Sequence, residues 1–409
     1  MQQADARAFF PGLSGADVLL DNAGGSQVPV DVADRVRSYF LEDYVQLGAD
    51  YRTSRRAVAT VEAARAFARV LCGAAADDPV ILGPSTSALC AALADAHARA
   101  PVPGRDEIVV CDAGHESNIG PWARLADRGY RVRWWKADPA TGDLRLEDLE
   151  ALLGARTRLV AVHHVSNILG RIEDVPGIVA RAHAVGARVV VDGVAFAPHQ
   201  AVDRVGLGAD FYVFSTYKVY GPHMAVLCGS RDAFEGLVGA NHFFVPESDV
   251  AYRFELGGVS HEGCAGLLGT RDYFARVAGV DSGDALDRAG VERAYRRFAD
   301  WESAPMRALV DAIQSRPQLR LLGPGSADPR VRVPTVSFVV RGRTSREVVL
   351  ACNDKGYGIR FGNFYAHRLV AALGLDPADG VVRASLVHYT TLDEVEGLIA
   401  ALDVALGVG

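Results

Sequence analysis

Apolar and polar positions between residues 79 and 229 alternate short β-branched or aromatic runs with amphipathic stretches. The short runs predict strands at residues 79–82, 107–111, 130–135, 158–164, 188–191, 211–214 and 225–228. The intervening stretches 87–99, 118–128 and 175–185 space their apolar residues as helices do. Nearly continuous apolar strands that alternate with helices are typical of a mainly parallel sheet covered on both faces. We therefore predict an α/β fold with a seven-stranded, mainly parallel sheet that binds ligands at the carboxyl ends of its strands.

The pattern changes near residue 260, after which strands no longer alternate regularly with helices. A long helix is predicted over residues 291–315, and strands at 332–340 and 356–360 are expected to pair with each other. A strand at 381–386 and a closing helix at 392–406 follow. These elements indicate a smaller α+β domain. We expect a large domain at residues 20–259 and a small domain made of residues 1–19 and 260–409.

Composition narrows the class of protein. The chain has 409 residues, of which 49% are hydrophobic and 23% charged, as in an ordinary soluble globular protein. No apolar run reaches the ~18 residues of a membrane span, and the N-terminus has no signal-peptide pattern. The net charge of −7 argues against nucleic acid and anionic membranes as partners. We expect a cytoplasmic protein with small-molecule or protein partners, and six scattered cysteines that are reduced and buried.

Polar residues that are unusual in this chain collect just after the predicted strands. Gly83 is followed, after a proline, by three hydroxyl residues that open a predicted helix. Free N–H groups there can bind an anion, although serine and threonine also serve simply as helix caps. Taken alone, His115 suits a surface capping loop and Asn167 suits a turn. Asp192 is harder to explain as structure, because a carboxylate at a buried strand end needs a cationic or hydrogen-bonding partner.

Lysine is rare in this sequence. It occurs only at Lys136, Lys218 and Lys355, and all other basic residues are arginines. Lys136 and Lys355 stand in polar turn sequences, where we expect them to face solvent. Lys218 follows the predicted strand 211–214 beside hydroxyl residues. A purely solvated lysine is a weaker explanation there, because arginine fills nearly every such place in the chain.

Together with Lys218, these residues supply an anion cradle, a flat ring, a strand-end carboxylate and an amine. Pyridoxal 5'-phosphate needs all four, because a lysine binds it as a Schiff base and an aspartate keeps its pyridine nitrogen protonated. The imidazole of His115 can stack on the ring, and the helix N-terminus can hold the phosphate. The adjacent His163 and His164 could suggest a metal, but no third ligand stands at a suitable spacing, so none is predicted.

On these residues the chain resembles the class V aminotransferase-fold, fold-type I pyridoxal-phosphate enzymes, and especially their cysteine-desulfurase-like branch. The resemblance covers nearly the whole chain and rests on segments 20–25, 115–122, 165–170, 191–199, 215–222, 253–258, 360–366 and 382–391. It implies the fold-type I fold, pyridoxal phosphate as the cofactor, and an amino-acid substrate. It also implies a homodimer with a shared active site, because the segment 253–258 resembles a loop that reaches the partner subunit's phosphate.

The resemblance assigns a role to each matching residue. Those with catalytic roles are Lys218, His115 and Asp192. Those that bind the cofactor are Thr86, Ser87, His115, Asn167, Asp192, Ser215, Tyr217, Lys218 and Gly258. Those that bind the substrate are Arg383, Ala23, Gly24, Asn167, Arg360 and Tyr365. Arg383 is the residue expected to pair with the substrate α-carboxylate, for which a bidentate guanidinium is well suited.

Four positions depart from the family pattern. Ala195 stands where a glutamine or histidine usually bonds the phenolic oxygen of the cofactor. Tyr217 replaces the usual histidine before the lysine, and Gly258 replaces a threonine. Tyr365 occupies the place of the cysteine that accepts sulfur as a persulfide in desulfurases. Because tyrosine cannot carry sulfane sulfur, the sequence argues against a sulfur-donating desulfurase.

We therefore expect a pyridoxal-phosphate enzyme whose preferred reaction is β-elimination (C–S lyase) of a cysteine S-conjugate, with Lys218 as base and acid. Decarboxylating or oxidative deamination of a similar substrate, transamination and epimerisation remain alternatives. A nucleotide-binding oxidoreductase is an alternative from another class, but no G-x-G-x-x-G follows an early strand. A non-enzymatic relative without cofactor is a further alternative, against which the retention of Lys218 and Asp192 argues.

Overall fold

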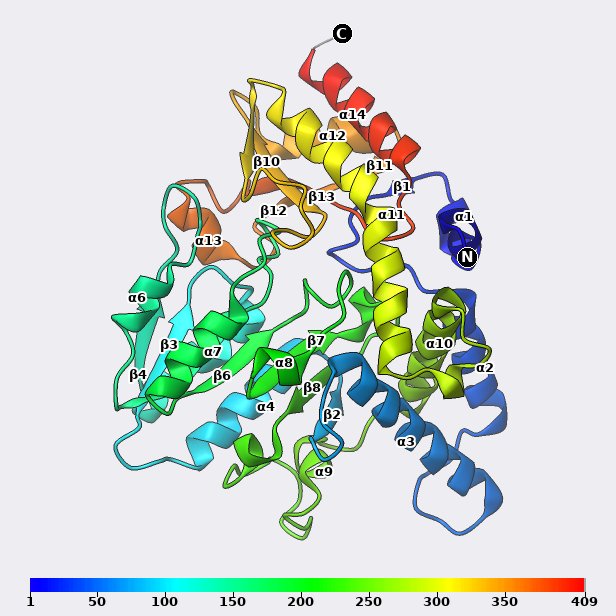
Figure 1. Cartoon of the computed structure of the whole chain (residues 1–409), viewed down its shortest axis with the longest axis vertical. Helices are drawn as coiled ribbons and strands as arrows, with labels where there is room; N and C mark the ends of the chain where they lie inside the picture. Colours follow the sequence, from blue (N-terminus) through cyan, green and yellow to red (C-terminus); the bar gives the residue numbers. More distant parts are fainter. Residues whose placement is uncertain (408–409) are drawn as a thin grey trace.

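The computed structural model describes residues 1–407, and its centre is a seven-stranded sheet (Figure 1). The strands are β2 (Val80–Gly83), β3 (Glu107–Cys111), β4 (Arg131–Trp135), β5 (Thr157–His163), β6 (Arg188–Asp192), β7 (Phe211–Ser215) and β8 (Ala225–Gly229). Their order across the sheet is β2-β8-β7-β6-β5-β3-β4. Strand β8 runs antiparallel to both of its neighbours, β2 and β7, and the other pairs in this sheet are parallel. The prediction of a mainly parallel, seven-stranded sheet is confirmed.

Both faces of this sheet are buried, as the continuous apolar strands predict. In β6, Val189 and Val191 join one apolar cluster and Val190 joins another, because successive side chains of a strand point to opposite faces. The first face is covered by α3 (Arg52–Cys72), α7 (Val175–Ala184) and α10 (His261–Ala278). The second face is covered by α4 (Thr86–Arg99), α5 (Gly120–Ala123) and α9 (Val250–Phe254).

The prediction of one helix over residues 118–128 is wrong. The segment is divided into the 3-10 turn η2 (Glu116–Asn118), the short helix α5 and the 3-10 turn η3 (Arg124–Arg128). Pro121 has no N–H to donate and stands in the first turn of α5, so the helix starts there. The side chain of Asn118 also receives a hydrogen bond from the Trp122 indole N–H at 2.9 Å, which holds the bend.

A second, four-stranded sheet lies in the C-terminal part, in the order β12-β13-β10-β9. These strands are β12 (Arg360–Gly362), β13 (Val381–Ser385), β10 (Thr335–Val340) and β9 (Leu319–Leu322). Its helices are α11 (Arg288–Gln314), α12 (Ser345–Asn353) and α14 (Leu392–Leu406). The closing helix has the predicted bounds, whereas β9 was not predicted.

The expected pairing between the strands at 332–340 and 356–360 is wrong. Strand β10 lies between β13 and β9. The segment 356–360 is divided between β11 (Tyr357–Gly358), which pairs with β1 (Val18–Leu19), and the start of β12, which pairs with β13. The chain changes sheets at Ile359, so no single strand spans the segment.

The remaining elements lie before, between or after these strands and helices. They are α1 (Gln3–Arg7), η1 (Pro11–Ser14), α2 (Val30–Glu42), α6 (Leu146–Glu150), α8 (Arg204–Leu207), η4 (Thr216–Lys218), η5 (Arg231–Phe234), η6 (Gly283–Ala285) and α13 (His367–Ala372). Helix α10 packs against α2 and α3, beside the large sheet (Figure 1). The division of the chain at residues 259 and 260 stays a prediction.

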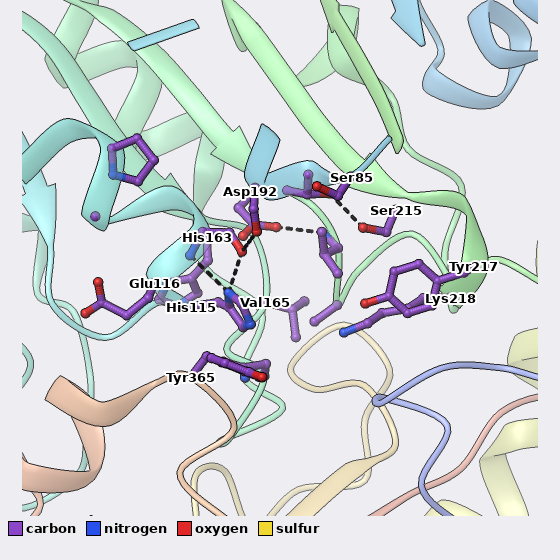
Figure 2. A pocket seen from close by; sticks show the side chains of 18 of the residues that line it. Ser85, His115, Glu116, His163, Val165, Asp192, Ser215, Tyr217, Lys218 and Tyr365 are labelled. Atoms are coloured by element: carbon purple, nitrogen blue, oxygen red, sulfur yellow. Dashed lines mark hydrogen bonds between the residues drawn. The ribbon is translucent and has the colours of Figure 1, made fainter. Parts of the chain in front are cut away.

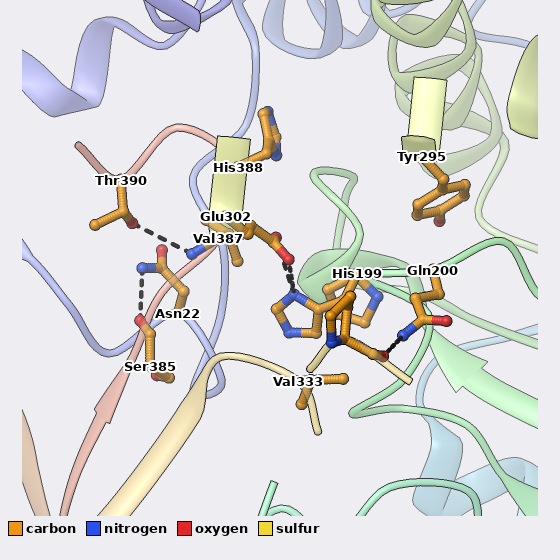
Figure 3. Close-up of polar contacts among 12 residues, drawn as sticks. Asn22, His199, Gln200, Tyr295, Glu302, Val333, Ser385, Val387, His388 and Thr390 are labelled. Carbon is orange, nitrogen blue, oxygen red and sulfur yellow. Dashed lines mark hydrogen bonds and ion pairs between the residues drawn. The ribbon is translucent and has the colours of Figure 1, made fainter. Parts of the chain in front are cut away.

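A buried polar junction joins α11 to the loop that follows β6 (Figure 3). His199 and Glu302 are both buried, and the His199 Nδ1 lies 3.0 Å from a Glu302 carboxylate oxygen. Burial raises the pKa of Glu302, and the contact with His199 opposes that rise. The Tyr295 hydroxyl donates to the Ala197 carbonyl oxygen at 2.5 Å. These contacts hold the loop that follows Asp192 in place. Asp192 itself belongs to the candidate site.

Candidate active site

Two adjoining cavities lie where the carboxyl ends of the large sheet face the C-terminal sheet. The first, of about 520 Å³, is bordered by Ser85, Thr86, Ser87, His115, His163, Asn167, Asp192, Ala195, Ser215, Tyr217, Lys218 and Tyr365, among others (Figure 2). The second, of about 390 Å³, is bordered by Ala23, Gly24, His115, Asn167, Tyr217, Lys218, Arg360, Phe364, Tyr365 and Arg383, among others. We call them the cofactor lobe and the substrate lobe. They share five of these residues, so they form one continuous site.

One end of the cofactor lobe is the N-terminus of α4. The Ser85 hydroxyl caps this helix by accepting the Ala88 N–H at 3.2 Å. The Thr86 hydroxyl is 2.7 Å from the hydroxyl of Ser215, the last residue of β7. The end of β7 therefore lies beside the N-terminus of α4. The Ser87 hydroxyl is 2.9 Å from that of Ser117. Hydroxyls and free N–H groups at a helix N-terminus form a cradle suited to a phosphate.

Asp192 also borders the cofactor lobe, at the end of β6. Its side chain is buried, and its Oδ1 accepts the Val194 N–H at 2.9 Å. Burial raises the pKa of this carboxyl, while the Val194 N–H, His163 and Lys218 favour its charged form. No lysine or arginine of residues 1–407 forms an ion pair with it. A ligand with a positively charged N–H at this position would supply the missing partner.

Lys218 reaches the point where the two lobes meet. Burial and the nearby positive charge of Arg383 lower the pKa of its amine from 10.5 to about 8, although Asp192 and Asp21 act in the opposite direction. The Nζ atom lies 5.7 Å from the centre of the Tyr217 ring. It makes no hydrogen bond or ion pair within the described part of the chain. An amine with a lowered pKa and no partner is prepared to act as a nucleophile or a base.

His115 presents a neutral imidazole to the same junction. Burial, together with the charges of Lys218 and Arg383, lowers its pKa to about 4. The Ser117 backbone N–H donates to Nδ1 at 3.0 Å, so the proton of the neutral ring is on Nε2. The ring lies 5.1 Å from that of Tyr365 at an angle of 42°. A neutral flat ring held in this way can stack on a planar ligand.

Arg383 lies at the base of the substrate lobe and is 2% exposed. Its Nη2 donates to Asp21 Oδ1 at 3.0 Å, and its Nη1 donates to the Asn167 carbonyl oxygen at 3.2 Å. Burial lowers its pKa to about 10, and Asp21 opposes this change, so the guanidinium is charged at neutral pH. Arg360 reaches the other oxygen of Asp21 at 3.4 Å. A Cβ at Gly24 would stand 2.7 Å from Asp21, which explains the need for glycine there.

The predicted site residues do not all lie together. Gly258 is exposed and borders neither lobe, so any contact it makes with cofactor has to be in another subunit. Ala195 borders the cofactor lobe with only a methyl group. Lys136 and Lys355 are exposed, as predicted. The six cysteines are free and buried, as predicted, and none borders either lobe in residues 1–407.

Sequence reasoning missed three residues of the site. Asp21 and Phe364 stand in segments that the resemblance had identified, but no role was expected for either. The structure pairs Asp21 with Arg383 and stacks Phe364 on it. His163 ends β5 and borders the cofactor lobe beside Asp192. Its adjacency to His164 suggested only a metal, and no group of three metal-binding side chains occurs among residues 1–407.

These groups fit pyridoxal 5'-phosphate. The buried carboxylate without an ion pair, the unpartnered amine and the hydroxyl-lined helix N-terminus match its pyridine nitrogen, its aldehyde and its phosphate respectively. In addition, Asn167 Oδ1 is buried without a hydrogen-bond partner in the described chain, beside the same cavity. An orphaned amide oxygen, a buried carboxylate without an ion pair and a basic nucleophile around one cavity are costly unless a ligand uses them.

The comparison with known families gives the same answer. The family described as Aminotransferase class-V matches residues 18–398, and the chain belongs to this family. It is a pyridoxal-phosphate-dependent enzyme, so the predictions of family, fold and cofactor are confirmed. No helix in the described chain is long and apolar enough to cross a membrane.

Proteins similar to this chain have different names, as two relatives and one solved structure show. The chain is 39% identical to an aminotransferase-like protein of Gibberella zeae, FGM3, over 98% of each protein. It is 35% identical to the nonribosomal peptide synthetase-like enzyme fsqF of Aspergillus fumigatus, over 98% of this chain and 26% of that protein. The crystal structure of the cysteine desulfurase CsdA of Escherichia coli superposes with a TM-score of 0.83 at 26% identity, covering 100% of this chain and 99% of that one.

Proposed function

We propose that the enzyme is a C–S lyase that removes the sulfur substituent of a cysteine S-conjugate by β-elimination. The observation that carries the proposal is the chemistry of the substrate lobe. Tyr365 stands at its mouth, 70% exposed, and no thiol of residues 1–407 borders the site. Without a thiol, the site has no acceptor for sulfane sulfur. A thiolate leaving group, in contrast, needs no acceptor other than a proton.

Four side chains of the site have a task in such a reaction. Arg383 binds the α-carboxylate, and Lys218 removes the α-proton and returns a proton to the product side. Asp192 would hold the protonated pyridine nitrogen of the cofactor, and His115 would stack on its ring. The cofactor, when bound, supplies the electron sink that stabilises negative charge on the α-carbon. The buried, unpaired amine of Lys218 and the buried carboxylate of Asp192 support these assignments.

The elimination balances without an external oxidant or reductant. The α-proton passes to Lys218, and the electron pair of the broken C–H bond forms the Cα–Cβ double bond. The electrons of the C–S bond leave with sulfur as a thiolate, which takes up a proton. Water then hydrolyses the released enamine to pyruvate and ammonia. A thiol with a pKa near ~8.5 is a fair leaving group.

The open mouth of the substrate lobe supports a substrate with an extended substituent. Arg360 and Tyr365 are both exposed at this mouth, so a group attached to sulfur can extend past them into solvent. Decarboxylating deamination of the same substrate starts from the same bound amino acid and differs in which bond at the α-carbon breaks. Product analysis distinguishes the two reactions.

The experiment is an incubation of the enzyme with S-alkyl and S-aryl cysteines, with assays for pyruvate, thiol, ammonia and carbon dioxide. We expect pyruvate, ammonia and thiol in equal amounts. Carbon dioxide without pyruvate would show that the reaction is decarboxylative deamination and not elimination. A persulfide on the protein after incubation with free cysteine would overturn the argument from Tyr365. The Tyr365→Phe variant serves as a control, because it keeps the ring at the mouth and adds no thiol.

We also propose that the enzyme works as a homodimer in the cytoplasm. The loop that ends at Gly257 and Gly258 is exposed, with φ of 74° and 87°, and supports a contact with a second subunit. Leu256 in this loop is 61% exposed, which suits a subunit interface. The six unpaired cysteines suit a reducing compartment.

A further inference from the structure

Phe364 lies flat against the guanidinium that is to bind the substrate. The Cζ atom of Arg383 is 3.6 Å from the centre of the Phe364 ring, which is the distance of direct stacking. The other charged group near this ring, Arg360, is 5.9 Å away. Asp21 and the Asn167 carbonyl oxygen occupy parts of the guanidinium edge. One face and part of the edge of Arg383 are therefore already covered.

The backbone that carries this ring is strained. Phe364 and Tyr365 have φ of 49° and 60°, and two consecutive non-glycine residues in the left-handed region are unusual. Such a conformation persists only when surrounding contacts determine it. Three hydrogen bonds do so here. Asn167 Nδ2 donates to the Phe364 carbonyl oxygen at 2.9 Å, the Glu116 N–H to the Tyr365 carbonyl oxygen at 2.9 Å, and the Tyr365 N–H to Asn363 Oδ1 at 3.0 Å.

We propose that Phe364 is a positioning residue that makes the enzyme select substrates with an α-carboxylate. The proposal rests on the proposed function, in which Arg383 binds that carboxylate. The ring blocks one face of the guanidinium and keeps water from it. A carboxylate can then approach only in the plane of the guanidinium, where the remaining N–H groups point.

The buried Nε of Arg383 supports this view. It has no hydrogen-bond partner in the described chain, so the guanidinium still has a donor to offer along its edge. Because the group is buried and stacked, an in-plane carboxylate interacts with it at a low effective dielectric. An amine without the carboxylate leaves this donor unpaired, and buried polar groups that stay unpaired reject a ligand strongly.

The test compares two ligands in the complete enzyme with its cofactor. One ligand is an S-alkyl cysteine, and the other is the matching S-alkyl cysteamine, which lacks only the carboxylate. Their dissociation constants are measured from the absorbance change of the bound cofactor, and KM and kcat are measured for the first. In Phe364→Leu we expect about a tenfold rise in KM, the scale of a lost cation–π contact, with kcat nearly unchanged. The preference for the carboxylate ligand should fall by about the same factor.

Two variants serve as controls. Phe364→Tyr keeps an aromatic face and should retain the preference. Phe361→Leu makes the same change at the other phenylalanine of the substrate lobe, which does not stack on Arg383, and should also retain the preference. Thermal unfolding midpoints within a few degrees of the wild type show that a loss is not due to unfolding.

The outcomes separate the inference from the function on which it rests. If Phe364→Leu keeps the full preference for the carboxylate ligand while Arg383→Gln loses it, the inference is wrong and the role of Arg383 stands. If Arg383→Gln also keeps the preference, the carboxylate site itself has been misassigned. An equal weakening of both ligands in Phe364→Leu would indicate a structural role only and would equally overturn the inference.

Discussion

The lowered pKa of Lys218 predicts how the cofactor-free enzyme takes up its cofactor as pH changes. Burial and Arg383 lower this pKa from 10.5 to about 8, whereas Asp192 raises it. Two substitutions should therefore move it in opposite directions. Asp192→Asn removes a negative charge, so the pKa should fall further. Arg383→Gln removes a positive charge, so the pKa should rise.

The size of the effect follows from the fraction of neutral amine, which is the form that attacks an aldehyde. At pH 7, an amine with a pKa of about 8 is neutral in roughly one molecule in ten. With an unperturbed pKa of 10.5, it would be neutral in roughly one in three thousand. The site should thus hold roughly 300 times more reactive amine than free lysine does at this pH.

The assay measures the rate at which the apoenzyme gains the absorbance near ~420 nm of the lysine-bound cofactor, between pH 6 and about pH 10. The rate should rise with pH and level off above a midpoint near pH 8, because the protonated amine below this midpoint does not react. The midpoint should be lower in Asp192→Asn and higher in Arg383→Gln. Lys355→Arg, at an exposed position, should leave it unchanged.

Two results would refute this reasoning. One is a wild-type midpoint close to that of a free lysine amine. The other is a shift of both variants in the same direction, since the two charges that they remove have opposite signs.

Three further predictions concern the cofactor and the assembly. Lys218→Ala should lose the borohydride-reducible chromophore, because Lys136 and Lys355 are exposed and outside the site; a retained chromophore would contradict the assignment. Asp192→Asn should keep the cofactor but lose roughly 10²-fold in turnover, the scale of a lost charge contact, and unchanged turnover would rule out its role. Sedimentation should show a dimer at assay concentrations, and a fully active monomer would exclude a contribution of Gly258 to a neighbouring site.

Local patterns in the sequence predict the large sheet well. Residues 108–111 are all apolar and the first three of them are β-branched, and the strand at Glu107–Cys111 has the predicted bounds. The helix at Leu392–Leu406 was also correctly bounded, since Thr391 and Glu394 form a capping box at its start. Prediction fails where local contacts interrupt a segment whose apolar residues have helical spacing. Residues 118–128 look helical by spacing, but a proline and the side-chain contacts of Asn118 divide them.

The cofactor side of the site could also be predicted from the sequence. His115, Asn167 and Lys218 each follow a strand of the large sheet, Asp192 ends one, and these four strands run parallel to one another. Because parallel strands end at the same edge, residues far apart in the chain have to meet there. Lysine is scarce in this chain, and Lys136 and Lys355 stand in polar turn sequences, so Lys218 is the amine expected in the site.

Only the tertiary structure decides the substrate side. The sequence places Asp21, Phe364 and Arg383 in three separate segments and gives no sign that they touch. They meet because β13 brings Arg383 beside the N-terminal segment that carries Asp21, and because a strained turn after β12 lays Phe364 on the guanidinium. Such contacts depend on how the two sheets pack. They also depend on left-handed backbone angles, which the sequence does not predict at residues other than glycine. Periodicity reports which side of a strand is buried, whereas the partner of each side chain is set by packing.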